Sequence, residues 1–172
     1  AAQLSESPDL RVALNVSAET IQNAEAAKAY LETLKSLNEK TRRITIEMTE
    51  TAALDAPELA THFSAEVRAL GCEFSIDDFG SGHTTFRNLM GIEAESIKLD
   101  GSLIKGISAS PQKQIFVRMM VDLADTFAVK IVAEMVEDKA DATALKHLGV
   151  DYLQGYLYGV PNASPSYRNS AS

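Results

Sequence analysis

The pattern of apolar and polar positions along the chain predicts strands and helices that alternate. Short apolar runs rich in β-branched residues predict strands, and longer segments with capping residues at their ends predict helices. The predicted strands cover residues 11–15, 43–48, 73–78, 96–100, 129–134 and 151–154. The predicted helices cover residues 17–37, 57–70, 111–127 and 138–148, with a short helical segment near 86–90.

Capping residues set several of these boundaries. Ser17 is a good N-cap for the first helix, and Pro57 suits the first turn of the second. Gly71 and Gly149 follow the second and the last helix, where a glycine ends a helix in the left-handed conformation. These residues support the predicted alternation of strands and helices.

Strands that alternate with helices favour a parallel sheet, and both open Rossmann-like sheets and closed barrels satisfy the pattern. Neither GxGxxG nor GxxxxGK[ST] is present, so the nucleotide-binding open sheets lose support. A TIM barrel needs eight strands and roughly 250 residues. The 172 residues here carry six strands. The predicted fold is therefore α/β, an incomplete modified TIM barrel with about six of eight strands.

The composition does not identify a function, but it restricts the number of domains, the partners and the location of the protein. The length suits one domain spanning residues 1–172, with a Ser/Asn-rich tail at 162–172 that is expected to be poorly ordered. The net charge of -8 disfavours a nucleic-acid polymer or an anionic lipid surface as partner. One cysteine, no membrane-length apolar run and no secretory signal favour a cytoplasmic domain without membrane contact.

A polar residue stands at the end of each predicted strand. Alone, each could be a turn residue, a helix cap or a solvated side chain, but the recurrence at six strand ends favours one shared site. In a barrel the carboxyl ends of the strands form a single rim, where catalytic groups collect. The residues are Asn15, Glu47, Asp77, Asp78, Lys98, Asp100, Glu134 and Gln154, with Glu50 and Glu137 shortly after two of these ends.

This set of side chains is suited to divalent cations. Mg²⁺ and Mn²⁺ prefer oxygen ligands, which Asn15, Glu47 and Asp77 offer, and Asp78 could reach a second ion. Two ions can activate a water and stabilise the leaving oxygen in phosphoryl transfer. Lys98 could hold the water or a phosphate oxygen, and Glu134 could be a base or a further ligand. Without metal the carboxylates would repel one another strongly.

Six motifs resemble, in order and spacing, those of the EAL domain family. They are LNVSA at 14–18, EMTE at 47–50, DDFGSG at 77–82, IKLD at 97–100, VAEMVE at 132–137, and QGY at 154–156 with Pro161. The resemblance covers residues 12–161. It implies a modified TIM barrel that hydrolyses cyclic di-GMP to pGpG with two Mg²⁺ or Mn²⁺ ions. It also implies a role in bacterial signal transduction that regulates biofilm formation and motility.

The resemblance also assigns roles. It implies metal ligation by Asn15, Glu47, Asp77, Asp78 and Glu134, and handling of the nucleophilic water by Lys98 and Glu134. Glu50 matches an anchor of the loop at 79–85, which couples dimer contacts to the site in the family, so a homodimer is implied. The positions that match substrate-binding or site-shaping residues are Asp100, Glu137, Gln154 and Pro161.

The chain departs from the family pattern in a few places. The Glu-Ala-Leu strand that names the family is not among the 14 residues before Asn15, so the domain is expected to be truncated at its N-terminus, without one ligand glutamate and a substrate-binding arginine. Met135 stands where Gly is usual, Gly101 where Arg is common, and His83 where an aromatic is usual. A catalytically weak or inactive cyclic di-GMP receptor is therefore the alternative function. An unrelated barrel enzyme using Mg²⁺ on an enolisable acid is a third.

Overall fold

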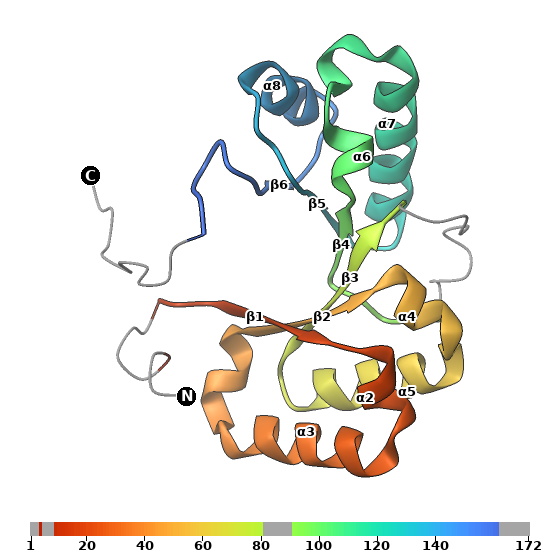
Figure 1. Ribbon diagram of the computed structural model, residues 1–172, viewed down its shortest axis with the longest axis vertical. Helices are drawn as coiled ribbons and strands as arrows, with labels where there is room; N and C mark the ends of the chain where they lie inside the picture. The colour runs from red at the N-terminus through yellow and green to blue at the C-terminus, as the bar shows by residue number, and fades with distance from the viewer. Residues whose placement is uncertain (1–3, 5–8, 81–90, 162–172) are drawn as a thin grey trace.

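Six parallel strands form one sheet in which each strand pairs with the next one along the chain (Figure 1). The computed structural model describes residues 4, 9–80 and 91–161. Consecutive order is the order of a barrel, whereas the doubly wound Rossmann sheet reverses at a switch point. The barrel-type prediction is therefore confirmed over these residues. The strands are β1 (Val12–Val16), β2 (Ile44–Thr49), β3 (Glu73–Phe79), β4 (Ser96–Leu99), β5 (Lys130–Ala133) and β6 (Tyr152–Leu153).

Helices flank the sheet on its outer side, with the N-terminal helices beside β1–β3 and the later ones beside β4–β6 (Figure 1). The α-helices are α2 (Ala18–Gln22), α3 (Ala24–Ser36), α4 (Glu50–Asp55), α5 (Pro57–Ala69), α6 (Gly101–Ile104), α7 (Pro111–Thr126) and α8 (Lys139–His147). Two 3-10 helices, η1 (Asn38–Arg43) and η3 (Ile107–Ala109), complete the described elements. None of these helices is long and apolar enough to cross a membrane.

The single helix predicted at 17–37 is in fact two helices. Ser17 caps α2 as predicted, since its side chain accepts the backbone N–H of Thr20. Asn23 then leaves the helical conformation, and its side chain accepts the N–H groups of Glu25 and Ala26 to start α3. Asparagine competes for backbone donors in this way, which makes it a strong N-cap even inside an otherwise helical pattern.

Short helices after strands were also missed by the sequence prediction. Thr49 caps α4 by accepting the N–H of Ala52, and Asp100 caps α6 by accepting that of Ser102. Such helices are too short to show a 3.6-residue period, so the caps are their main sequence signal. Pro57 begins α5 and Gly71 follows its end at φ +85°, as predicted. The helical segment at 86–90 and the tail at 162–172 lie outside the described residues.

Buried and partly exposed residues alternate along β2, so the two faces of the sheet carry different side chains. Ile44, Ile46 and Met48 are fully buried against the helices. Thr45 and Glu47 point to the opposite, inner face, because successive strand residues alternate between faces. The inner face therefore receives polar side chains, and the strand ends bring their functional groups to one side of the sheet.

Asp141 in α8 ties that helix to the connection between α6 and α7. Its carboxylate accepts hydrogen bonds from the backbone N–H groups of Gly106 (2.8 Å) and Ser108 (2.9 Å) and from the Ser108 hydroxyl (2.6 Å). Burial alone would raise the pKa of Asp141, but these hydrogen bonds, those of Ser108 first, outweigh it and lower the pKa. The ionised carboxylate is therefore a structural link.

We expect Asp141→Asn to lower the free energy of unfolding by about 1.5–3 kcal/mol at pH 7, the usual size for hydrogen bonds to a charged group. Because the folded pKa is lowered, this stabilisation is present above the unfolded pKa of about 3.9 and is lost as the pH falls through the folded pKa. Urea denaturation at pH 7 and in acid measures the difference. The exposed Asp125→Asn on α7 is the control, and a deficit independent of pH would contradict the account.

Candidate functional site

The ammonium of Lys98 lies at the centre of the site. Its Nζ is 3.0 Å from Glu47 Oε1, 3.0 Å from Asp77 Oδ1 and 2.7 Å from Glu134 Oε1. The Lys98 side chain is 8% exposed and the three carboxylate side chains 13–15%. Four neighbouring strands thus deliver one cation and three anions to a single, mostly dry position, as the strand-end argument predicts.

A bulge in β3 brings two consecutive aspartates to the rim. Between β3 and β4 the register shifts: Ile76 pairs with Ile97, but Phe79 pairs with Leu99, so β3 holds one extra residue. Asp78 adopts a left-handed φ of +54°, a conformation that aspartate tolerates better than most residues. In a regular strand neighbouring side chains would face opposite ways. The bulge removes that constraint.

The geometry and chemistry of the acids fit a divalent cation. Carboxylate oxygens of Asp77, Asp78 and Glu134 lie within 4.8 Å of one another, close enough to hold divalent metal among them. Carboxylates are the oxygen ligands that Mg²⁺ and Mn²⁺ prefer. Four carboxylates, counting Glu47, share the one ammonium of Lys98, so negative charge is in excess. A metal ion would balance that excess.

The pKa shifts follow from this excess of negative charge. Burial raises the pKa of Asp78, and the charges of Asp77 and Asp100 raise it further against the pull of Lys98. Burial also raises the pKa of Glu134, which stays above its usual range although Lys98 is hydrogen-bonded to it. Burial disfavours the charged form of Lys98, but its hydrogen bonds to Glu134 and Asp77 outweigh that and raise its pKa. Lysine is therefore firmly charged, while the acids need more positive charge than it supplies.

Glu50 anchors the chain where β3 ends. It is 2% exposed, and its Oε2 accepts a 2.7 Å hydrogen bond from the backbone N–H of Gly80. Gly80 has φ +92°, and a Cβ there would collide with Leu103 of α6. The contact fits the predicted anchoring role for the start of the 79–85 loop. The rest of that loop, from residue 81, lies outside the described residues.

Other predicted residues lie near the cluster without joining it. Asn15 is opposite Glu47 in the β1–β2 register, which places it on the same rim. The hydrogen bonds of Ser102, its side chain first, lower the pKa of Asp100, and Asp100 caps α6. Gln154 lines an inner-face cavity of about 380 Å³ that also contains Glu47 and Lys98. Four predicted positions are exposed and take no part in the ion pairs of Lys98: Asn15, Glu137, Gln154 and Pro161.

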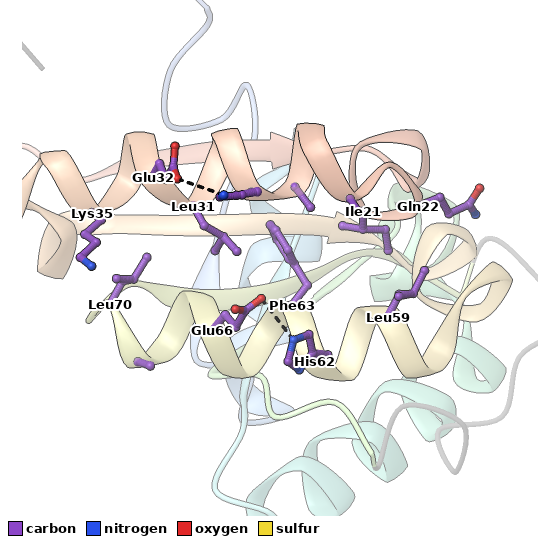
Figure 2. A pocket seen from close by; sticks show the side chains of 14 residues that line it. Ile21, Gln22, Leu31, Glu32, Lys35, Leu59, His62, Phe63, Glu66 and Leu70 are labelled. Atoms are coloured by element: carbon purple, nitrogen blue, oxygen red, sulfur yellow. Dashed lines mark ion pairs between the residues drawn. The ribbon is translucent and has the colours of Figure 1, made fainter.

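A larger cavity, of about 570 Å³, lies on the outer side between α3 and α5 (Figure 2). Its walls are mostly apolar, with Leu31 and Phe63 pointing into it. Ion pairs within one helix, such as His62–Glu66 at 3.5 Å, border it. It holds none of the strand-end residues, and its polar groups do not converge on one point. We therefore place the functional site on the inner rim, despite the smaller cavity there.

Consecutive parallel strands with an acidic, lysine-centred cluster at their carboxyl ends define a barrel-type α/β protein with a candidate metal site. The chain belongs to the EAL domain family, whose family model matches residues 1–161. It is 32% identical to the cyclic di-GMP phosphodiesterase PdeF of Escherichia coli (strain K12), over 90% of this chain and 21% of that protein. The chain thus spans about a fifth of the length of such curated relatives.

Solved structures agree with the fold. The PaMucR phosphodiesterase in complex with c-di-GMP matches with a TM-score of 0.81 and 30% identity, over 89% of this chain and 68% of that one. The manganese and c-di-GMP complex of Klebsiella pneumoniae BlrP1 matches with a TM-score of 0.80 and 25% identity, over 91% of this chain and 40% of that one. The α/β fold is therefore that of the TIM-barrel-like EAL domains.

The structure adds two features that the strand-end argument did not contain. The bulge at Asp77–Asp78 has no sequence signal beyond the acidic pair itself. The side chain of Met135, which directly follows Glu134, packs over Gly101. Both residues could be seen in the sequence only as departures from the EAL pattern, and nothing there indicated that they touch.

Proposed function

We propose that this domain hydrolyses cyclic di-GMP to the linear dinucleotide pGpG with the help of divalent cations, Mg²⁺ or Mn²⁺, two in number. The observation that carries the proposal is the Lys98 ammonium within 3.0 Å of three carboxylates, with Asp78 beside them. Relatives named as cyclic di-GMP phosphodiesterases, and structures with c-di-GMP bound, support the substrate. The domain would work in the cytoplasm.

Each side chain has a definite task in this proposal. Asn15, Glu47, Asp77 and Glu134 would hold one ion, and Asp78 the other. When bound, the ions supply Lewis-acid stabilisation of the phosphoryl oxygens and lower the pKa of a water. Lys98 would donate hydrogen bonds to the incoming water or to a phosphate oxygen, while Glu134 would accept the proton of the water. The P–O3′ bond breaks as the water oxygen bonds to phosphorus, which opens the ring.

The remaining predicted positions would shape the substrate site. Asp100 lies at the start of α6 beside Asp78, and Gln154 lines the inner-face cavity. Glu137 and Pro161, which are both exposed in this structure, would also contribute to the substrate site. Glu50 would keep the beginning of the loop in place through Gly80.

The test is hydrolysis by the full-length protein, since six strands are described here and a TIM barrel has eight. Cyclic di-GMP is incubated with Mg²⁺ or Mn²⁺, and pGpG is separated by chromatography. We expect pGpG in the presence of either ion and none with a chelator. Tight binding without turnover would instead make the domain a cyclic di-GMP receptor, and the absence of both binding and turnover would refute the proposal.

We further propose that the domain forms a homodimer through α7. Ile115 and Met119, one turn apart, are each 63% exposed, and Phe116 beside them is 39% exposed. Large apolar side chains grouped on one helix face are typical of an interface. The family resemblance, which implies a dimer, makes a second copy of the chain the expected occupant.

We expect Met119→Glu to convert the dimer to a monomer, because a charge would be buried without a partner in the interface. Light scattering coupled to gel filtration measures the mass. The control is Thr33→Glu, which adds the same charge to an exposed position on α3. A dimer that survives Met119→Glu, or a wild-type monomer at micromolar concentration, would contradict this assignment.

A further inference from the structure

Met135 has a backbone conformation that a methionine rarely adopts. Its φ is +52°, in the left-handed region where a side chain is strained, and its side chain is 60% exposed although it is large and apolar. Strained residues of this kind cluster where a site needs a particular side chain in a particular place. Met135 directly follows Glu134, so the strain lies at the edge of the proposed active site.

The side chain of Met135 fills the space that Gly101 leaves open. A Cβ at position 101 would lie 2.8 Å from Met135 Cβ and 2.9 Å from its Cγ, and closer still to its Sδ. Gly101 is the first residue of α6, where the helix itself would favour alanine. Contact with Cβ and Cγ cannot be relieved by moving only the end of the side chain. Gly101 and Met135 both depart from the EAL pattern, and they depend on each other. Met135 can occupy its position because residue 101 has no side chain.

Backbone hydrogen bonds fix Met135 on the rim. The N–H of Glu134 donates to Leu99 O (3.2 Å), and the N–H of Val136 donates to Gln154 O (3.0 Å). Met135 is therefore held between two strand ends, with its side chain directed over the residue that follows Asp100. Its exposed apolar side chain therefore lies next to the strand ends that carry Glu134 and Asp100.

We propose that Met135 is a specificity-determining contact, whose thioether packs against the flat face of a purine base of the cyclic dinucleotide. The inference rests on the proposed function, because it takes its substrate class from there. Thioether sulfur makes favourable contacts with aromatic rings, and an unbranched side chain adapts to their shape. The charged groups of the rim would bind the phosphate and the metal. Met135 would then offer the apolar surface against which a base can pack.

The first test is Met135→Gly in the full-length protein. We expect KM and the Kd for cyclic di-GMP to rise about three- to tenfold, the size of one sulfur–aromatic contact, with kcat changed less than twofold. The thermal midpoint should stay level or rise, because glycine adopts φ +52° without strain. Weaker binding of cyclic di-GMP together with an unchanged or higher thermal midpoint would show that Met135 contacts the substrate rather than supports the fold.

Further variants use the contact with Gly101. Met135→Leu should keep KM within about twofold, whereas Met135→Asn, which suits a left-handed φ but is polar, should behave like glycine. Gly101→Ala should displace Met135 and raise KM by a similar factor. In the Met135→Gly background, Gly101→Ala should have no further effect on KM, because the displaced side chain is already absent.

Two failures can be told apart. A wild-type protein that neither binds nor hydrolyses cyclic di-GMP overturns the proposed function and, with it, this inference. A wild-type protein that binds or hydrolyses it, with KM and Kd unchanged in Met135→Gly, overturns the inference alone. A fall in kcat without a rise in KM also overturns it, since Met135 would then act by positioning Glu134.

Discussion

Asp77→Asn should lower hydrolysis of cyclic di-GMP by more than about 100-fold, exceeding the 10–100-fold typical of groups that only support a ligand. The substitution keeps the shape of the side chain but removes a charge from the group of acids that lie within 4.8 Å of one another. Asp77 also contacts Lys98 at 3.0 Å, so its loss would disturb both the proposed metal site and the ammonium.

Stability should change far less than activity in this variant. Asp77→Asn weakens an ion pair with Lys98, but it also removes a negative charge that, after burial, helps to raise the pKa of Asp78 and Glu134. We expect these effects to offset one another, leaving the free energy of unfolding within about 1 kcal/mol of wild type. Initial rates and chemical denaturation are measured together, with Asp125→Asn as the matched control. Activity within tenfold of wild type would exclude Asp77 as a metal ligand.

Lys98→Met should produce the largest loss of stability. It leaves Glu47, Asp77 and Glu134 without the cation that each contacts within 3.0 Å. Breaking a buried ion pair from one side typically costs about 3–5 kcal/mol, because the remaining charge is uncompensated. Methionine replaces the aliphatic part of lysine, so lost packing contributes little. Activity should also fall, by about 10²–10⁴-fold if Lys98 holds the water for proton transfer.

The pH dependence identifies the cause of that loss. Burial already raises the pKa of Glu134 in the folded wild type, although Lys98 lowers it, so removing Lys98 should raise the pKa of Glu134 further. A raised folded pKa means that an acid stabilises the fold less as the pH rises above its unfolded value, about 4.3 for glutamate. The deficit of Lys98→Met should therefore be largest near pH 7 and small below about pH 4.

Divalent metal gives a second check on the same variant. If uncompensated carboxylates cause the loss, millimolar Mg²⁺ should raise the thermal midpoint of Lys98→Met more than that of wild type. The exposed Lys139→Met on α8 is the control for removing a lysine charge. A deficit that depends on neither pH nor Mg²⁺ would mean that Lys98 acts by packing rather than by charge.

The sequence predicts the sheet and most of the cluster, because both follow from strong local signals. Six apolar runs give six strands, and parallel strands in consecutive order bring their carboxyl ends together. The strand order and the positions at strand ends are then enough to predict the cluster of Glu47, Asp77, Lys98 and Glu134. The position of a residue at a strand end was the decisive signal.

What the sequence does not predict depends on contacts between distant segments or on competition within one segment. Asn23 interrupts a helical pattern because its side chain captures two backbone donors. The bulge that aligns Asp77 with Asp78 comes from the register between β3 and β4. The packing of Met135 over Gly101 joins residues on different strand ends, and no local pattern marks it.

The central claim is that the Asp77–Asp78 rim of this barrel binds divalent metal for cleavage of a phosphodiester. The most direct measurement is anomalous diffraction at the manganese edge, from crystals of the protein grown with Mn²⁺ and cyclic di-GMP. We predict manganese peaks among the carboxylates of Asp77, Asp78 and Glu134, lost in crystals of Asp77→Asn. A fully occupied substrate with no peak at these carboxylates, or peaks that persist in Asp77→Asn, would contradict the account.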